Sequence, residues 1–228
     1  MRRNHAKRFF LLVSGMLFMG MGIAVITRAG LGAPPIATLS YVIGAIGGIS
    51  LGTATFALNA LLLAMEAVIL GRMFKPSQIL QLPAAFLFSL FIDAGMLAAN
   101  RFTSGSWAAQ IIMVAAGVLI LAFGIVLEIA SSTVFLPGDG FVLALAYKTK
   151  LPFGNIKVMN DIAFVLAAFC LGMLFLGKPA GLREGTAIAA VFTGFAVKAF
   201  GRVMNPVLLR GLNGSAQNHS VQSTMKAG

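Results

Sequence analysis

The chain has 228 residues, of which 59% are hydrophobic, and its mean hydropathy of +0.94 is accompanied by a formal net charge of +11. Soluble domains are about half apolar, so this composition excludes an ordinary soluble protein. The basic residues lie in short clusters at the ends of apolar segments, for example Arg72 with Lys75, as the positive-inside rule predicts. We therefore expect the lipid bilayer as the surroundings of this chain, and no nucleic acid as a partner.

Long windows without Asp, Glu, Lys or Arg predict membrane-spanning helices. Residues 9–27 and 102–127 are two such windows, and each reaches the roughly 17–25 residues that a membrane helix needs. The chain opens like a signal peptide, but its apolar stretch is too long for that and further spans follow. We interpret it as an uncleaved first helix of an all-α polytopic membrane protein.

The second half of the sequence repeats the first at a constant offset. Gly15 aligns with Gly117, Gly22 with Gly124, and Asn59 with Asp161. In the same order, the glycine- and proline-rich break "GLGAPPIATLSY" falls opposite "FLPGDGFVLALAY". Ordered matches of this kind indicate an internal duplication, with repeat A over residues 9–100 and repeat B over residues 108–205.

Each repeat is predicted to contain three long helices and one short helix. The expected ranges are 9–28, 34–46, 52–71 and 77–99 in repeat A, and 108–130, 139–148, 154–177 and 184–204 in repeat B. The short segment "DGFVLALAYK" would cover roughly 15 Å, about half of a hydrocarbon core of ~30 Å. We expect both short helices to be re-entrant half-helices between about six transmembrane helices.

Three spans in each repeat would force the second copy into the opposite orientation, which predicts an inverted 3+3 internal repeat. A parallel 4+4 topology gives nearly the same charge bias and stays open. Residues 1–210 are expected to form a single transmembrane domain with a cytoplasmic N-terminus, and residues 211–228 a disordered cytoplasmic tail. Six spans suit either a complete unit or one protomer of a homo-oligomer.

The two breaks are candidate substrate sites, because backbone that leaves helical form inside a membrane must be buried in protein or line a wet cavity. The first break contains four residues with special backbone properties: Gly30, Gly32, Pro34 and Pro35. The helix that follows it would present free N–H groups to the protein centre. In the second break Asp139 stands at the predicted N-cap, where its carboxylate would satisfy those donors. A tight packing corner is the alternative interpretation of both breaks.

Polar residues on the helices after the breaks form a second group of candidates. Thr55, Asn59 and Glu66 lie close to one helical face in repeat A. Lys157 and Asp161 occupy the positions of Thr55 and Asn59 in repeat B. A charge at a helix centre costs about 2.5–3.5 kcal/mol, so such groups usually face a cavity or a partner. We expect a polar lining where the repeats meet, with Asp161 as an ion or proton site, unless Lys157 reaches the membrane surface and simply pairs with Asp161.

The sequence offers little material for catalysis. Both histidines, His5 and His219, lie in the terminal tails, and the single Cys170 lies in an apolar segment. The common hydrolase, zinc and phosphate-loop motifs are absent from the sequence. We therefore expect no enzyme, no metal and no cofactor. Asp93 and Lys198, at similar places in the last helix of each repeat, are expected to form a structural charge pair.

The stretches "GLGAPPIATLSY" and "SLGTATFALNALLLAMEAVILGR" resemble the YczE/YyaS/YitT group of bacterial integral membrane proteins, and the YczE-like branch most closely. The resemblance covers most of residues 10–205. It implies a multi-pass protein of the bacterial cytoplasmic (inner) membrane. It supplies no settled activity and no residue roles.

The leading interpretation is a small secondary transporter or permease-like protein for an unknown small molecule or ion, with its path at the repeat interface. If the substrate is an anion, we expect it to bind at residues 32–36. If it is a cation or proton, we expect it to bind at Asp139 and Asp161. The alternative is a membrane accessory or scaffold protein that supports a cytoplasmic enzyme or biosynthetic complex through residues 72–75 and the tail.

Overall fold

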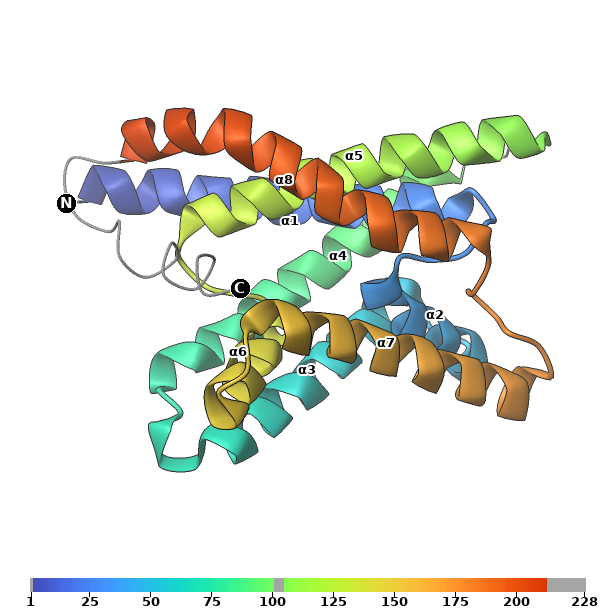
Figure 1. Ribbon diagram of the computed structural model, residues 1–228, viewed down its shortest axis with the longest axis horizontal. Helices are drawn as coiled ribbons and strands as arrows, with labels where there is room; N and C mark the ends of the chain where they lie inside the picture. The colour runs from blue at the N-terminus through green and yellow to red at the C-terminus, as the bar shows by residue number, and fades with distance from the viewer. Residues whose placement is uncertain (1, 101–104, 213–228) are drawn as a thin grey trace.

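The computed structural model describes residues 2–100 and 105–212, and this part of the chain is all helical (Figure 1). The long helices are α1 (Arg2–Arg28), α3 (Leu51–Leu70), α4 (Gln81–Ala99), α5 (Trp107–Ser131), α7 (Phe153–Leu171) and α8 (Glu184–Leu212). The short helices are α2 (Pro35–Gly47) and α6 (Pro137–Thr149). Two 3₁₀ turns, η1 (Gly71–Met73) and η2 (Pro76–Leu80), connect α3 to α4, and a π-helical turn, η3 (Gly172–Leu176), extends α7.

Six helices of the described chain are long and apolar enough to cross a membrane. Their apolar spans are Ala6–Arg28, Leu51–Met73, Pro76–Ala99, Trp107–Ser131, Phe153–Leu176 and Glu184–Met204. The predicted all-α membrane class and the six spans are thus confirmed, and most helix ends lie within a few residues of the predicted ones. The predicted tail lies almost entirely outside the described residues.

Proline and serine residues set the starts of several helices. Pro35 and Pro137 occupy the first position of α2 and α6, where the missing N–H leaves no hydrogen bond unmade. Ser50 caps α3, because its Oγ accepts a hydrogen bond from the Thr53 N–H at 3.0 Å. Gly48, at φ 63°, takes the left-handed conformation that ends α2 and turns the chain into α3.

Helices α1 and α5 pack antiparallel along a seam of four glycines, Gly15, Gly22, Gly117 and Gly124. A Cβ atom at Gly22 would lie 2.5 Å from the backbone nitrogen of Leu121, and one at Gly124 would lie 2.7 Å from the carbonyl oxygen of Gly15. Since residue numbers rise along α1 as they fall along α5, the two helices run in opposite directions (Figure 1). Small residues allow this close backbone approach, which packing in lipid favours.

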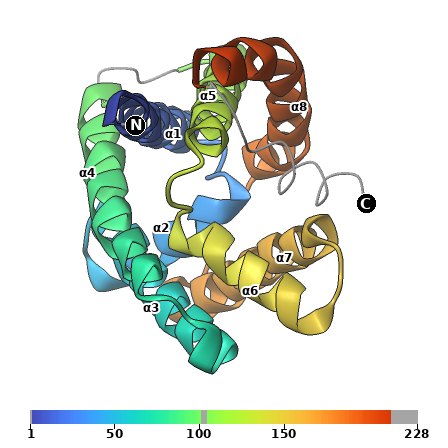
Figure 2. The ribbon, with the colours of Figure 1, turned by 90° about the vertical axis from the view of Figure 1, so that its left-hand side faces the viewer.

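The halves of the chain exchange their short helices. Helix α6 packs on α3 of the first half, and α2 packs on α7 of the second half. Helix α4 packs on α1 just as α8 packs on α5. Viewed from the end in Figure 2, α1, α5 and α8 lie together at the top, α3, α6 and α7 lie below them, and α2 is near the centre. An apolar cluster that includes Val42, Leu62 and Phe164 joins α2, α3 and α7.

Replacing Gly22 by leucine is expected to destabilise the protein by about 1–3 kcal/mol or more, because the new side chain would collide with the backbone of α5. The measurement is the unfolding midpoint in mild detergent. Gly194→Leu on α8 is the matched control, since a Cβ atom at Gly194 meets nothing within 4 Å. Equal losses of stability in the two variants would contradict the glycine seam.

Candidate functional site

The first turn of α6 begins inside the protein, and side chains of two other helices accept its backbone hydrogen bonds. The chain leaves α5 at Ser132, which has a φ of 48°, and enters α6 five residues later. Glu128 Oε1 accepts from the Leu136 N–H at 3.3 Å, and Asn59 Oδ1 accepts from the Gly138 N–H at 3.2 Å. Asn59 and Glu128 are 8% and 4% exposed. Buried acceptors from α3 and α5 thus satisfy donors that a helix start otherwise leaves unpaired.

Asp139 lies at the third position of α6 rather than at its N-cap, which is Leu136. The prediction that Asp139 caps the helix is therefore wrong in its detail, because Asn59 and Glu128 supply the acceptors. The carboxylate of Asp139 instead accepts from Lys157 Nζ at 3.0 Å.

Lys157 lies between two carboxylates. Its Nζ atom is 3.0 Å from Asp139 Oδ1 and 3.6 Å from Asp161 Oδ1, and the three side chains are only 27–31% exposed. The predicted pairing of Lys157 with Asp161 is formed, and Asp139 joins it from α6. With Glu128 bonded to the same turn, carboxyl groups outnumber the ammonium group around the start of α6.

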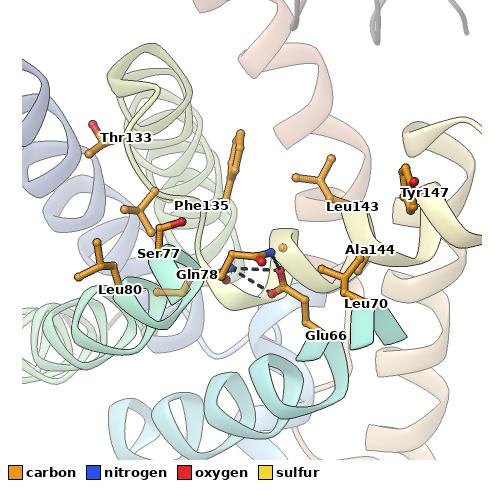
Figure 3. A pocket seen from close by; sticks show the side chains of 13 residues that line it. Glu66, Leu70, Ser77, Gln78, Leu80, Thr133, Phe135, Leu143, Ala144 and Tyr147 are labelled. Atoms are coloured by element: carbon orange, nitrogen blue, oxygen red, sulfur yellow. Dashed lines mark hydrogen bonds between the residues drawn. The ribbon is translucent and has the colours of Figure 1, made fainter. Parts of the chain in front are cut away.

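A cavity of about 330 Å³ lies beside this turn, between α3, η2, the start of α4, the α5–α6 connection and α6 (Figure 3). The side chain of Glu66, which is 1% exposed, lies at its base. Gln78 Nε2 donates to Glu66 Oε1 at 2.6 Å, and Gln81 Nε2 lies 3.2 and 3.1 Å from the two carboxylate oxygens. Gly140 of α6 closes one side, where a Cβ atom would lie 2.6 Å from Glu66 Oε2.

Sequence reasoning placed Glu66 on the polar face of its helix but missed Gln78 and Gln81. The two glutamines are three residues apart in the polar stretch before a long apolar run, so they share a face where the chain turns back toward α3. This spacing was the available signal. Only the turn through η1 and η2 brings both amides onto the carboxylate.

The first break is closed by the segment that leads into α8. The Ala33 N–H donates to the Gly181 carbonyl at 2.9 Å, and Arg183 Nη1 donates to the Gly30 carbonyl at 2.9 Å. Gly32 has a φ of 107°, and a Cβ atom there would collide with the hydroxyl of Thr186. This geometry favours the packing-corner interpretation of the first break.

The two prolines of the first break start the short helix. Pro34 is the N-cap of α2 and is buried, and Pro35 is the first residue of the helix. The Pro34 carbonyl accepts a hydrogen bond from Thr38 Oγ1 at 2.9 Å. The two prolines fix the backbone at the start of α2. The first turn of that helix has no acidic side chain, whereas the first turn of α6 has Asp139.

The remaining predicted residues, Thr55, Asp93 and Lys198, lie outside the group at the start of α6. Thr55 is buried, but its hydroxyl donates to the Leu51 carbonyl of its own helix at 2.7 Å. Asp93 accepts from Ser50 Oγ at 2.6 Å and from the Gly52 N–H at 2.8 Å, so its carboxylate holds the start of α3. Lys198 is exposed on α8, and within the described residues no ion pair joins it to Asp93. The predicted Asp93–Lys198 pair is therefore not formed.

A protein-family model described as a family of unknown function (DUF6198) matches residues 6–202. No curated protein and no solved structure matches the chain. The match covers most of the chain, and the resemblance to the YczE/YyaS/YitT group, with its YczE-like branch, stays a prediction.

Replacing Lys157 by methionine is expected to lower the stability by about 1–3 kcal/mol, because Asp139 and Asp161 then face each other without a cation. Adding Asp139→Asn to that variant should restore part of the loss, since one of the two carboxylates is removed. Both effects are read from unfolding midpoints in detergent. Lys198→Met is the matched control and should change little; a loss as large as that of Lys157→Met would contradict the ion-pair role.

Proposed function

The chain belongs to the family of unknown function DUF6198, and from its site we propose that it is a small secondary transporter or permease-like membrane protein. Its substrate path lies where the two halves of the chain meet. The observation that carries the proposal is the first turn of α6, where a helix starts inside the protein among charged and polar side chains of α3, α5 and α7. Transporters place substrate sites at such discontinuous helices.

We further propose that the halves form an inverted 3+3 repeat. Three pairings support this symmetry: α1 packs antiparallel on its counterpart α5, α4 packs on α1 as α8 packs on α5, and the short helices are exchanged. The contacts of the glycine seam have the same symmetry. Gly15 lies against Gly124 and Gly22 against Gly117, so swapping the repeats maps each contact onto the other.

The short helices act as re-entrant half-helices in this proposal. Helix α6 begins where Gly138 meets Asn59, in the middle part of α3, and near its end the Tyr147 hydroxyl lies 3.7 Å from the sulfur of Met73, where the span of α3 ends. It therefore covers about half the length of its neighbour. Rocking of one half against the other about the α1–α5 seam would expose the α6 start to each side in turn.

The scaffold alternative rests on the exposed basic connection that holds Arg72 and Lys75. It predicts that a cytoplasmic partner co-purifies with the protein and is lost in the Arg72→Ala, Lys75→Ala double variant. Helix α6 and its charged neighbours would then have only a structural role.

Purified protein in proteoliposomes tests transport directly. The probes are labelled methylammonium, acetate, alanine and glucose, which cover the four charge classes of small solutes. Wild-type vesicles are expected to take up at least one probe faster than protein-free vesicles do. Asp161→Asn should reduce that uptake by about tenfold or more, because it removes a charge from the proposed path.

Asp93→Asn is the matched control for this experiment. It makes the same chemical change at a half-buried carboxylate that holds the start of α3, away from α6. Its uptake should stay close to that of the wild type. Equal uptake by Asp161→Asn and wild type, or no uptake of any probe, would overturn the transport proposal.

A further inference from the structure

The carboxylate of Glu66 is buried without a cation. Both of its oxygens accept hydrogen bonds from glutamine amides. In the described part of the chain, Lys157 and Arg183 form ion pairs with other carboxylates, and no ion pair involves Glu66. A buried charge without a counter-charge is costly, so a cation from outside the chain would be stabilised here.

A second polar atom in the same cavity lacks a partner. Gln81 is 4% exposed, and its Nε2 is used by Glu66, but its Oε1 accepts no hydrogen bond. A Cβ atom at Gly140 would lie 2.7 Å from this oxygen and 2.6 Å from Glu66 Oε2, so both acceptors lie close to the same backbone position of α6. A ligand that donates several N–H bonds is able to serve both.

The cavity also has apolar side chains in its wall, and it is too large for a bare metal ion. A volume of about 330 Å³ falls in the range of small-molecule pockets. Leu80, Phe135 and Leu143 line it, and in Figure 3 Phe135 and Leu143 lie across from Glu66. Among the described residues no three acidic, cysteine or histidine side chains are grouped to hold a metal ion. An aromatic ring beside a carboxylate favours an organic cation.

We infer that this cavity binds a small primary amine in its ammonium form. The ammonium donates to Glu66 and to Gln81 Oε1, and the apolar part of the amine packs on Phe135, Leu80 and Leu143. The inference rests on the proposed transport function and names its substrate class as a primary organic amine. Carboxylate ligands are excluded because they would meet Glu66 with like charge.

The cavity is reached from the surface between η2 and α6. Ser77, Leu80 and Tyr147 on its rim are exposed, whereas Glu66 at the base is not. This rim lies at the same end of the molecule as the start of α1 (Figure 1). An amine therefore enters from that side and reaches the first turn of α6, next to the Asp139–Lys157–Asp161 group.

Binding is measured on the purified full chain in detergent, by calorimetry with n-butylamine as the probe at a pH where the amine is protonated. Butyrate, tetramethylammonium and sodium ions are the comparison ligands. The expected result is saturable binding of n-butylamine that is at least about tenfold tighter than that of tetramethylammonium, which cannot donate a hydrogen bond.

Three variants locate the site. Glu66→Gln keeps the size of the side chain but removes its charge and replaces one acceptor oxygen by an NH2 donor, and it should weaken n-butylamine binding by about tenfold or more. Glu66→Asp keeps the charge with a shorter reach and should retain part of the affinity. Asp93→Asn, the matched loss of a carboxylate elsewhere, should bind as the wild type does.

The failures of the two proposals are distinguishable. Absence of n-butylamine binding, or equal binding by wild type and Glu66→Gln, overturns the amine inference, even if another solute shows uptake that depends on Asp161. Binding of n-butylamine that requires Glu66, without uptake of any solute, supports the amine site and overturns transport. Unchanged unfolding midpoints of the variants exclude misfolding as the cause of lost binding.

Discussion

The fold depends on the acceptors that Asn59 and Glu128 provide at the start of α6. A helix that begins in an apolar interior has N–H groups that neither water nor its own backbone satisfies, and each would cost several kcal/mol unpaired. Asn59 reaches this turn from α3 and Glu128 from α5, so the turn is held between the two halves of the chain. These hydrogen bonds fix the position of α6. They thereby place Asp139 beside Lys157 and Gly140 against Glu66.

The two breaks share a sequence pattern but differ in what covers them. The first is occupied by the segment before α8, whose backbone and Arg183 bond to Ala33 and Gly30. Among the described residues, no distant segment forms backbone hydrogen bonds with the second break, and the cavity at Glu66 lies beside it. Segments that share a sequence pattern are therefore free to differ in chemistry while the helices around them keep their packing, because the glycine seam between α1 and α5 does not involve charged side chains.

Patterns within one helix were readable from the sequence, whereas contacts between helices were not. Charge-free windows and the short length of "DGFVLALAYK" predicted the spans and the short helices, since length and hydropathy decide what crosses a membrane. Asp93 was misassigned because its partners are the Ser50 hydroxyl and the Gly52 N–H at the start of α3, and a backbone donor cannot be recognised in a sequence. Gln81 was missed for a related reason: an amide becomes informative only beside the carboxylate that the fold brings to it.

Lys157 illustrates what an ammonium group does among these buried acids. At 3.0 and 3.6 Å from two carboxylates, it offsets charges that would otherwise repel each other at the start of α6. Glu66 lies on the other side of the same turn and is more completely buried, but the described chain provides it with amides alone. Amides donate hydrogen bonds without neutralising charge. The carboxylate of Glu66 therefore has hydrogen-bond donors but, among the described residues, no positive charge to balance it. An external amine would supply at Glu66 the ammonium that Lys157 supplies to Asp139 and Asp161. The cavity and the ion-pair group would then both stabilise buried carboxylates by pairing them with an ammonium group.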